Sequence, residues 1–271
     1  MPDADAGPGY YAYLTYNVPL SSMRAHRLVA ALAAADPRTV LDAGCGWGEL
    51  LLQVLACVPA ASGVGVVDTD PKALARGRAN ADSLGLTDRV RFVEAAAAEA
   101  TQEPADVVIC LGSSQAFGSS ADALHALYPL LRPGGRLLFG DAIWERPPTA
   151  ELIEQLAGLG TVTDLAGVVD IAIDAGFRPL SIGSASRAEW EEFESGYLAD
   201  WEEWLLGNTK HPDAGHIRAA ADAHRDQWLR GYRARLAGDP GPSRPLHRQP
   251  RPVRLCRRSA VLRPHGGRRG P

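Results

Sequence analysis

The sequence contains no apolar run of about 18 residues, the length that a membrane-spanning helix requires. Its first residues are acidic and contain Gly and Pro, so we expect no secretory leader. Cysteine is scarce, and Cys45, Cys57, Cys110 and Cys256 show no CxxC spacing, so we predict neither a zinc site nor a disulfide framework. These absences favour a reduced protein of the cytoplasm that holds no metal.

Basic residues are scarce in most of the chain. Residues 1–238 carry 19 Lys and Arg against 31 Asp and Glu, a net charge of −12, whereas residues 239–271 carry nine Arg and one Asp, a net +8. Nucleic-acid binding depends on clustered cations, so the acidic body argues against such a partner. The last 33 residues also contain seven Pro and four Gly, and we predict that they are disordered.

Strand-like and helix-like patterns alternate from about residue 21 to residue 185. Short apolar runs such as VVICL and RLLFG are typical of strands that are covered on both faces. The alternation predicts an α/β fold with a doubly wound, mostly parallel sheet. We predict strands at residues 39–41, 64–67, 89–93, 106–111, 136–139 and 178–182.

We divide the chain into four regions from these changes of pattern. They are an N-terminal lid and helix (1–35), a ligand-binding α/β domain (36–185), a helical cover (186–238) and the basic tail (239–271). A helix face in the second region carries Leu124, Leu127, Tyr128 and Leu131.

The segment VLDAGCGWGELLLQVL, residues 40–55, places Gly44, Gly46 and Gly48 between a strand and a helix. Glycine allows a tight turn and a close approach of the backbone to a ligand. Asp68 ends the next strand 20 residues after Gly48, where a carboxylate accepts hydrogen bonds from ribose hydroxyls. Asp70, just before Pro71, is the better helix cap. The pattern indicates a ligand that contains a nucleoside.

This segment resembles the first motif of class I S-adenosylmethionine-dependent methyltransferases, in which an acidic residue precedes GxGxG. Dinucleotide dehydrogenases more often have GxGxxG, and residue 49 is Glu. The resemblance covers about residues 20–185. The segment GDAIWERPP and the Trp-rich helices also resemble a group of bacterial small-molecule methyltransferases. The resemblance implies a Rossmann-like fold, S-adenosyl-L-methionine as cofactor, and a cofactor site made by Asp42, Gly44, Cys45, Gly46, Gly48, Asp68, Thr69, Ala96, Ala97, Leu111 and Gly112.

Two positions depart from the family pattern. The acid that usually contacts the adenine amine is replaced by Ala96, and loss of that hydrogen bond costs about 0.5–1.5 kcal/mol. The family's seventh, antiparallel strand has no convincing counterpart, because Val253–Leu255 and Ala260–Leu262 are short and flanked by Arg and Pro. We therefore expect that strand to be missing. Our hypothesis is that the tail is translated out of the ancestral frame, although the sequence does not distinguish this from a native tail.

The acceptor should bind at the carboxyl ends of the fourth and fifth strands. The residues that we expect in its pocket are Ser113, Ser114, Gln115, Trp144 and Tyr16. Gln115, Glu145 and His125 are weak candidates for catalysis, although a surface position is the simpler interpretation of His125. A base is needed only if the acceptor must lose a proton.

Aromatic residues gather in two places outside the α/β pattern. Tyr10, Tyr11, Tyr13 and Tyr16, with Asn17, are candidates for a lid over the cofactor. Trp190, Phe193, Tyr197, Trp201 and Trp204 form a helical stripe, which is a candidate wall for the acceptor pocket, although core packing is the simpler interpretation. The acids between them are most simply a solvated face; they are Glu191, Glu192, Glu194, Asp200, Glu202 and Glu203.

The sequence favours a methyltransferase that acts on a small-molecule acceptor by in-line displacement. A degenerate module that binds S-adenosylmethionine without catalysis remains an alternative because of Ala96 and the unusual tail. An NAD-dependent oxidoreductase is a weaker one, because the glycine spacing and a Tyr-Lys pair are lacking. The sequence names neither the acceptor nor the oligomeric state.

Overall fold

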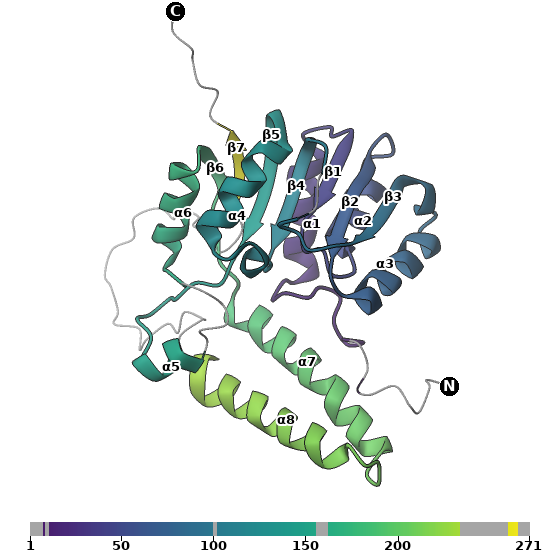
Figure 1. Ribbon diagram of the computed structural model, residues 1–271, viewed down its shortest axis with the longest axis vertical. Coiled ribbons are helices and arrows are strands. Elements are labelled where there is room, and N and C mark those ends of the chain that lie inside the picture. Colours follow the sequence, from purple (N-terminus) through teal and green to yellow (C-terminus); the bar gives the residue numbers. More distant parts are fainter. Residues whose placement is uncertain (1–7, 9–10, 100–101, 156–161, 234–259, 265–271) are drawn as a thin grey trace, which may run out of the picture.

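The computed structural model describes residues 8, 11–99, 102–155, 162–233 and 260–264. Within them, one seven-stranded sheet has the order β3-β2-β1-β4-β5-β7-β6 (Figure 1). The strands are β1 (Thr39–Asp42), β2 (Ser62–Asp68), β3 (Val90–Glu94), β4 (Ala105–Leu111), β5 (Leu131–Gly140), β6 (Phe177–Ser181) and β7 (Ala260–Pro264). The α-helices are α1 (Ser22–Ala33), α2 (Glu49–Cys57), α3 (Pro71–Ser83), α4 (Ser120–Leu127), α5 (Ala150–Gln155), α6 (Leu165–Asp174), α7 (Arg187–Gly207) and α8 (Ala214–Asp226).

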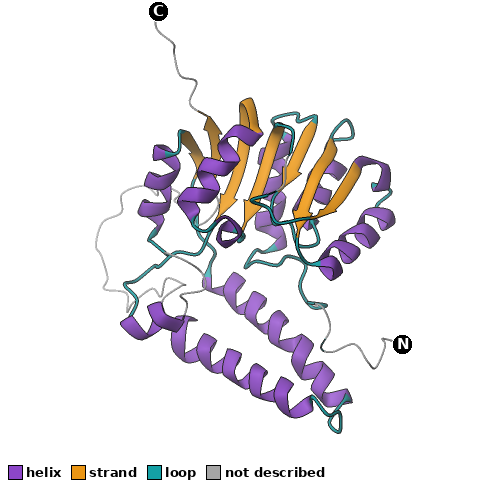
Figure 2. Ribbon diagram, viewed as in Figure 1, coloured by secondary structure: helices purple, strands orange, loops and turns teal. Residues whose placement is uncertain are grey.

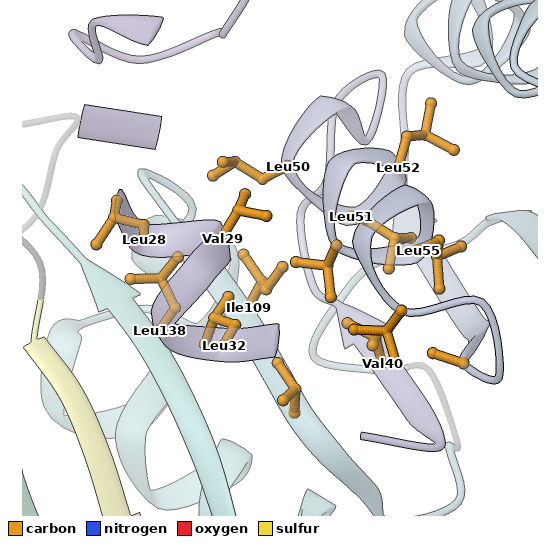
Figure 3. Packing of buried hydrophobic residues seen from close by; sticks show 14 of the residues in the cluster. Leu28, Val29, Leu32, Val40, Leu50, Leu51, Leu52, Leu55, Ile109 and Leu138 are labelled. Carbon is orange, nitrogen blue, oxygen red and sulfur yellow. The ribbon is translucent and has the colours of Figure 1, made fainter. Parts of the chain in front are cut away.

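Helices cover both faces of the sheet, as the doubly wound pattern predicts. Val107 and Ile109 of β4 point into the cluster formed with α1, α2 and α3, which Figure 3 shows from close by. Val108 and Cys110 point to the opposite face, where α4 and α6 pack. Because successive residues of a strand face opposite sides, the continuous apolar run of β4 is buried on both. The predicted fold class is confirmed.

The expected absence of a seventh strand is wrong. β7 lies between β5 and β6 and pairs antiparallel with both, with Leu138 opposite Val261 and Arg178 opposite Arg263. A strand placed between two others gains backbone hydrogen bonds on both sides, which does not require an apolar alternation in its own sequence. This strand removes the structural reason for interpreting the tail as out of frame. The rest of the predicted disordered tail lies outside the described residues.

One predicted helix face extends too far. α4 ends at Leu127, a 3₁₀ turn covers Tyr128–Leu130, and Leu131 begins β5. Proline cannot donate the backbone hydrogen bond that a longer helix would need, and residue 129 of this turn is Pro. β5 therefore begins before the predicted strand 136–139 and includes the Pro133-Gly134-Gly135 segment.

A second layer of helices lies at the carboxyl ends of the parallel strands, where α7 and α8 run side by side (Figure 2). Its core is a cluster of buried residues: Trp144, Leu152, Leu198, Ala221, Trp228 and Tyr232. α8 continues into a π-helical turn at Gln227–Tyr232. None of the described helices is long and apolar enough to cross a membrane.

Candidate functional site

The turn between β1 and α2 holds the first half of the site. Gly44, Gly46 and Gly48 all have positive φ, at 72°, 55° and 69°, a conformation that favours glycine. A Cβ at Gly44 would lie 2.3 Å from the Cβ of Ser113, so packing alone requires glycine there. A Cβ at Gly46 would meet nothing closer than 4.0 Å. The turn therefore leaves space in front of Gly46, next to the amino end of α2.

That space is a cavity of about 160 Å³, which we call the acidic cavity. Three carboxylate residues line it, Asp42, Glu49 and Asp68, and none of its described lining residues is Lys, Arg or His. Such a lining attracts a ligand with positive groups. It repels the pyrophosphate of a dinucleotide, which binds where positive charge or free N–H groups meet it.

Asp42, at the end of β1, is the most perturbed acid of this cavity. Its side chain is buried, and burial raises its pKa to about 8, with repulsion from Asp68 as the second cause. Burial disfavours the charged form of a carboxyl group, and a second carboxylate nearby adds to the effect. A cation bound next to Asp42 would favour its ionised form and so lower this raised pKa.

Asp68 is fixed at the end of β2 by two backbone groups. Its Oδ2 accepts a hydrogen bond from Gly46 N–H at 2.8 Å, and its Oδ1 accepts one from Asp70 N–H at 3.0 Å. Asp70 caps α3 by accepting from Lys72 N–H and Ala73 N–H, as its sequence position predicts. The two acids therefore divide the roles: Asp70 stabilises a helix, and Asp68 faces the cavity.

Residues 11–20, which we call the strap, contribute Tyr16, Asn17 and Val18 to the lining of the acidic cavity. Arg76 donates to the carbonyl oxygens of Tyr11 and Leu14 at 2.9 and 2.6 Å, and Trp47 Nε1 donates to Thr15 at 2.8 Å. The Arg76 guanidinium also lies 4.0 Å from the centre of the Trp47 ring. These bonds hold the strap on the α/β domain.

The aromatic residues expected as a lid have separate environments. Tyr16 lines the acidic cavity, and its hydroxyl accepts from Gln53 Nε2 at 2.8 Å. Tyr11 packs between Trp47 and Tyr197, with ring centroids 5.9 and 5.4 Å apart. Tyr13 is exposed, and Tyr10 lies outside the described residues.

A second cavity, of about 260 Å³, adjoins the first; we call it the apolar cavity. Strap residues, the end of β5 and the first turns of α7 form its walls. Five residues line both cavities: Asn17, Val18, Leu111, Gly112 and Gln115. The two cavities therefore meet across a short wall at the carboxyl end of β4.

The acidic cavity brings together a large part of the predicted cofactor set. Its lining includes these members of that set: Asp42, Gly44, Cys45, Gly46, Asp68, Leu111 and Gly112. Gly48 is the N-cap of α2 behind the turn. Thr69, Ala96 and Ala97 do not belong to the lining of either cavity, so their contact with a cofactor stays a prediction.

The predicted acceptor residues are more scattered. Gln115 lines the apolar cavity, whereas Ser113 and Tyr16 line only the acidic one. The Ser113 hydroxyl donates to the Ala43 carbonyl at 2.8 Å, and Ser114 is buried in a 3₁₀ turn. Trp144 lines neither cavity. It packs in the core of the helical cover, in one cluster with residues of α7 and α8.

The weak catalytic candidates have structural partners. Glu145 Oε1 accepts from the Ser184 hydroxyl at 2.9 Å, and neither residue lines the two cavities. His125 is exposed on α4 with its Nδ1 2.8 Å from the Ala121 carbonyl oxygen. His125 therefore has the surface position that was its simpler interpretation from the sequence.

The expected solvated face of α7 is wrong for two acids. Glu194 is 2% exposed, with the Tyr232 hydroxyl donating to it at 2.6 Å and His224 Nε2 at 2.8 Å. Asp200 is 4% exposed and accepts two bonds from Ala12 N–H. Buried carboxylates are tolerated because donors from distant segments satisfy them.

Sequence reasoning missed several residues that shape the site. Val18 of the strap lines both cavities, as does Asn17 of the candidate lid, and Trp47 and Glu49 line the acidic one. Trp190 and Phe193 line the apolar cavity; they belong to the aromatic stripe for which a pocket wall was the alternative to core packing. Glu189 was not singled out either, although it joins α7 to the start of α1 by accepting from the N–H and the hydroxyl of Ser21. The capping pattern Ser186-x-x-Glu189 was the signal available for it.

Comparisons with known proteins agree with this geometry. A family model described as a methyltransferase domain matches residues 41–137. The uncharacterized protein YjhP of Escherichia coli K12 is 30% identical over 184 residues, which cover 66% of this chain and 73% of YjhP. The X-ray structure of E. coli YjhP gives a TM-score of 0.73 at 23% identity, covering 92% of this chain and 95% of that one.

A second solved structure shares the same fold. It is a SAM-dependent methyltransferase from Geobacter sulfurreducens in complex with S-adenosyl-L-homocysteine. The TM-score is 0.75 at 23% identity, and the match covers 92% of this chain and 93% of the other.

Proposed function

Because the chain belongs to the class I S-adenosylmethionine-dependent methyltransferases, we propose that it methylates a small-molecule acceptor by in-line displacement. It is a methyltransferase, and S-adenosyl-L-methionine is its methyl donor. The observation that carries the proposal is the pair of adjoining cavities. One is lined by carboxylates and the other by apolar side chains, and they share a wall at the end of β4.

The residues of the acidic cavity fit this cofactor. S-adenosylmethionine supplies a methyl group on a positively charged sulfonium, and it also carries an ammonium, a carboxylate and a ribose. Glu49 and Asp68 supply negative charge, Asp42 adds to it when a bound cation favours its ionised form, and the Asp68 carboxylate accepts from ribose hydroxyls. The amino end of α2 offers N–H groups to a carboxylate, and the space in front of Gly46 admits the ligand.

The shared wall positions the acceptor against the cofactor. Gln115 offers an amide to orient a polar group, and Asn17 offers another from the strap. The strap and α7 exclude water, so alignment and desolvation supply much of the rate. A cavity of about 260 Å³ lies just below the range of about 300–1,000 Å³ that is usual for drug-sized ligands, which favours a small molecule over a macromolecule.

The first experiment is thermal unfolding with and without S-adenosylhomocysteine, using NAD as the control. A ligand at 100 times its Kd stabilises the folded state by about 2.7 kcal/mol, a readily measured shift. The second is release of S-adenosylhomocysteine from S-adenosylmethionine in the presence of small-molecule, protein and nucleic-acid fractions. Turnover that requires a protein or nucleic-acid fraction would contradict the proposed acceptor class. The cytoplasmic location stays a prediction.

A further inference from the structure

The apolar cavity carries a pattern of charge that identifies a class of acceptor. Two of its wall residues are charged, Asp141 at the end of β5 and Arg24 in the first turn of α1. Asn17 and Gln115 contribute neutral amides, and the other described lining residues are apolar or glycine, including Leu20, Trp190 and Phe193. What these two charges can offer to a ligand depends on their existing partners.

Arg24 is already neutralised within the protein. Its Nη1 lies 3.3 Å from Glu189 Oε2, and the side chains of the pair are 9% and 10% exposed. Glu189 also accepts from the backbone and hydroxyl groups of Ser21 and Ser186, and the pKa of its carboxyl is lowered by these bonds and by Arg24, although burial opposes them. A buried pair of this kind contributes no net charge to the cavity.

Asp141 has only neutral partners within the described part of the chain. Its Oδ2 accepts from the Ser120 hydroxyl at 2.5 Å, and its Oδ1 accepts from Ala142 N–H at 2.7 Å. No Lys, Arg or His side chain of the described residues forms an ion pair with it. Each carboxylate oxygen has two lone pairs, so both oxygens keep one acceptor position.

Two aromatic rings stand in the same cavity. Trp190 and Phe193 form an edge-to-face pair with centroids 6.1 Å apart and an interplanar angle of 87°. Faces of aromatic rings attract cations, and the attraction is strongest where water is excluded. A carboxylate in the same cavity as two aromatic rings, where Arg24 is the cation among the described lining residues and is already neutralised, is chemistry suited to an ammonium group.

We propose that the acceptor is a small, largely apolar amine whose protonated nitrogen binds the Asp141 carboxylate in the apolar cavity, which Trp190 and Phe193 also line. An ammonium has no lone pair, so methylation at this nitrogen would require that its proton first pass to the Asp141 carboxylate. This inference rests on the proposed function, because it takes the apolar cavity as the acceptor site. The net charge of −12 over residues 1–238 also steers cations toward the protein. An amine of one or two rings matches a volume of about 260 Å³.

The test uses the full chain saturated with S-adenosylhomocysteine and three matched probes: 2-phenylethylamine, 2-phenylethanol and 3-phenylpropionate. Their affinities are measured by calorimetric titration. We expect the amine to bind roughly tenfold to hundredfold more tightly than the alcohol, which is the range of one charge-assisted hydrogen bond, and the carboxylate to bind most weakly. Asp141→Asn should abolish the preference for the amine.

Ser120→Ala is the matched control. It removes the hydrogen bond that the Ser120 hydroxyl donates to Asp141, and it leaves the charge of Asp141 in place. It should keep the preference for the amine. The affinity for S-adenosylhomocysteine should stay unchanged in both variants, since neither residue lines the acidic cavity.

Three outcomes overturn the inference while leaving the cofactor assignment intact. They are equal or reversed preference among the probes, a preference for the amine that survives in Asp141→Asn, and binding of S-adenosylhomocysteine with no binding of the amine. Failure of the wild-type protein to bind S-adenosylhomocysteine would instead contradict the proposed function itself.

Discussion

The two adjoining cavities differ in how the chain builds them. The acidic cavity takes most of its chemistry from two strand-to-helix connections, one after β1 and one after β2. The apolar cavity is assembled from the strap, the end of β5 and the start of α7, segments that are far apart in the sequence. Local backbone geometry therefore sets the cofactor end, whereas long-range packing sets the acceptor end. Variants that affect one cavity and spare the other test this division.

The largest expected effect comes from Asp68→Ala at the acidic cavity. It removes a carboxylate expected to accept two ribose hydroxyls, so the Kd for S-adenosylhomocysteine should rise roughly a hundredfold or more. The matched control is Asp70→Ala, which removes the cap of α3 and costs about 1 kcal/mol of stability. Calorimetric titration of both variants with S-adenosylhomocysteine measures the two Kd values. Equal loss of affinity in the two would mean that Asp68 acts only by shaping the turn.

Gly46→Ala should have the next largest effect. The new methyl group enters the space in front of the turn, and we expect at least a tenfold loss of affinity for S-adenosylhomocysteine. Gly85→Ala is its control, since Gly85 also has a positive φ (65°) and open space around it but lies after α3, outside both cavities. Both substitutions place a non-glycine residue in the left-handed region at a cost of about 1–2 kcal/mol. If both variants bind equally well, the ligand does not pass Gly46.

The pH dependence of cofactor binding should come from Asp42. Its carboxyl has a pKa of about 8 in the ligand-free protein, above its ordinary value of 3.8, so it is protonated at pH 7. A positively charged ligand favours the ionised form, so affinity for S-adenosylmethionine should rise from pH 6 to pH 8, by up to about tenfold per unit, and then level off. Asp42→Asn should remove this part of the pH dependence; a profile identical to wild type would rule out Asp42 as its source.

The Asp42 carboxyl group also makes the stability of the folded protein depend on pH. Stability falls as the pH rises, whereas the affinity for the cofactor rises. Because the folded protein holds the Asp42 proton more tightly than the unfolded chain, the contribution of this group is greatest below pH 3.8. It is lost as the pH rises toward 8, with a slope of at most about 1.4 kcal/mol per pH unit. Chemical denaturation of the ligand-free protein between pH 5 and pH 8 measures it, with Asp42→Asn as the reference. A stability of wild type that does not fall relative to the variant would contradict the raised pKa.

The sequence was informative where chemistry is local. Three glycines after β1, Asp68 at the end of β2 and Asp70 as a cap all follow from spacing within two successive strand-to-helix connections. Glu194 and Asp200 could not be predicted as buried, because their donors lie 30 and 188 residues away. Trp144 was placed in the acceptor pocket from its position after β5, and no sequence pattern indicated that it would pack with distant residues of α7 and α8 and lie outside the lining of both cavities. β7 was missed because its partners, not its own pattern, make it a strand.

The smallest expected effect on the cofactor is that of Trp190→Ala in the apolar cavity. Trp190 lines this cavity and not the acidic one, so the Kd for S-adenosylhomocysteine should change less than threefold. The substitution removes an aromatic wall, so the affinity for 2-phenylethylamine should fall roughly threefold to thirtyfold, the range of a cation–π contact with some loss of apolar area. Trp204→Ala is the control, since Trp204 is on the same helix and packs on His211 outside both cavities. A large loss of S-adenosylhomocysteine binding in Trp190→Ala alone would show that α7 shapes the cofactor end as well, and the division between the two cavities would fail.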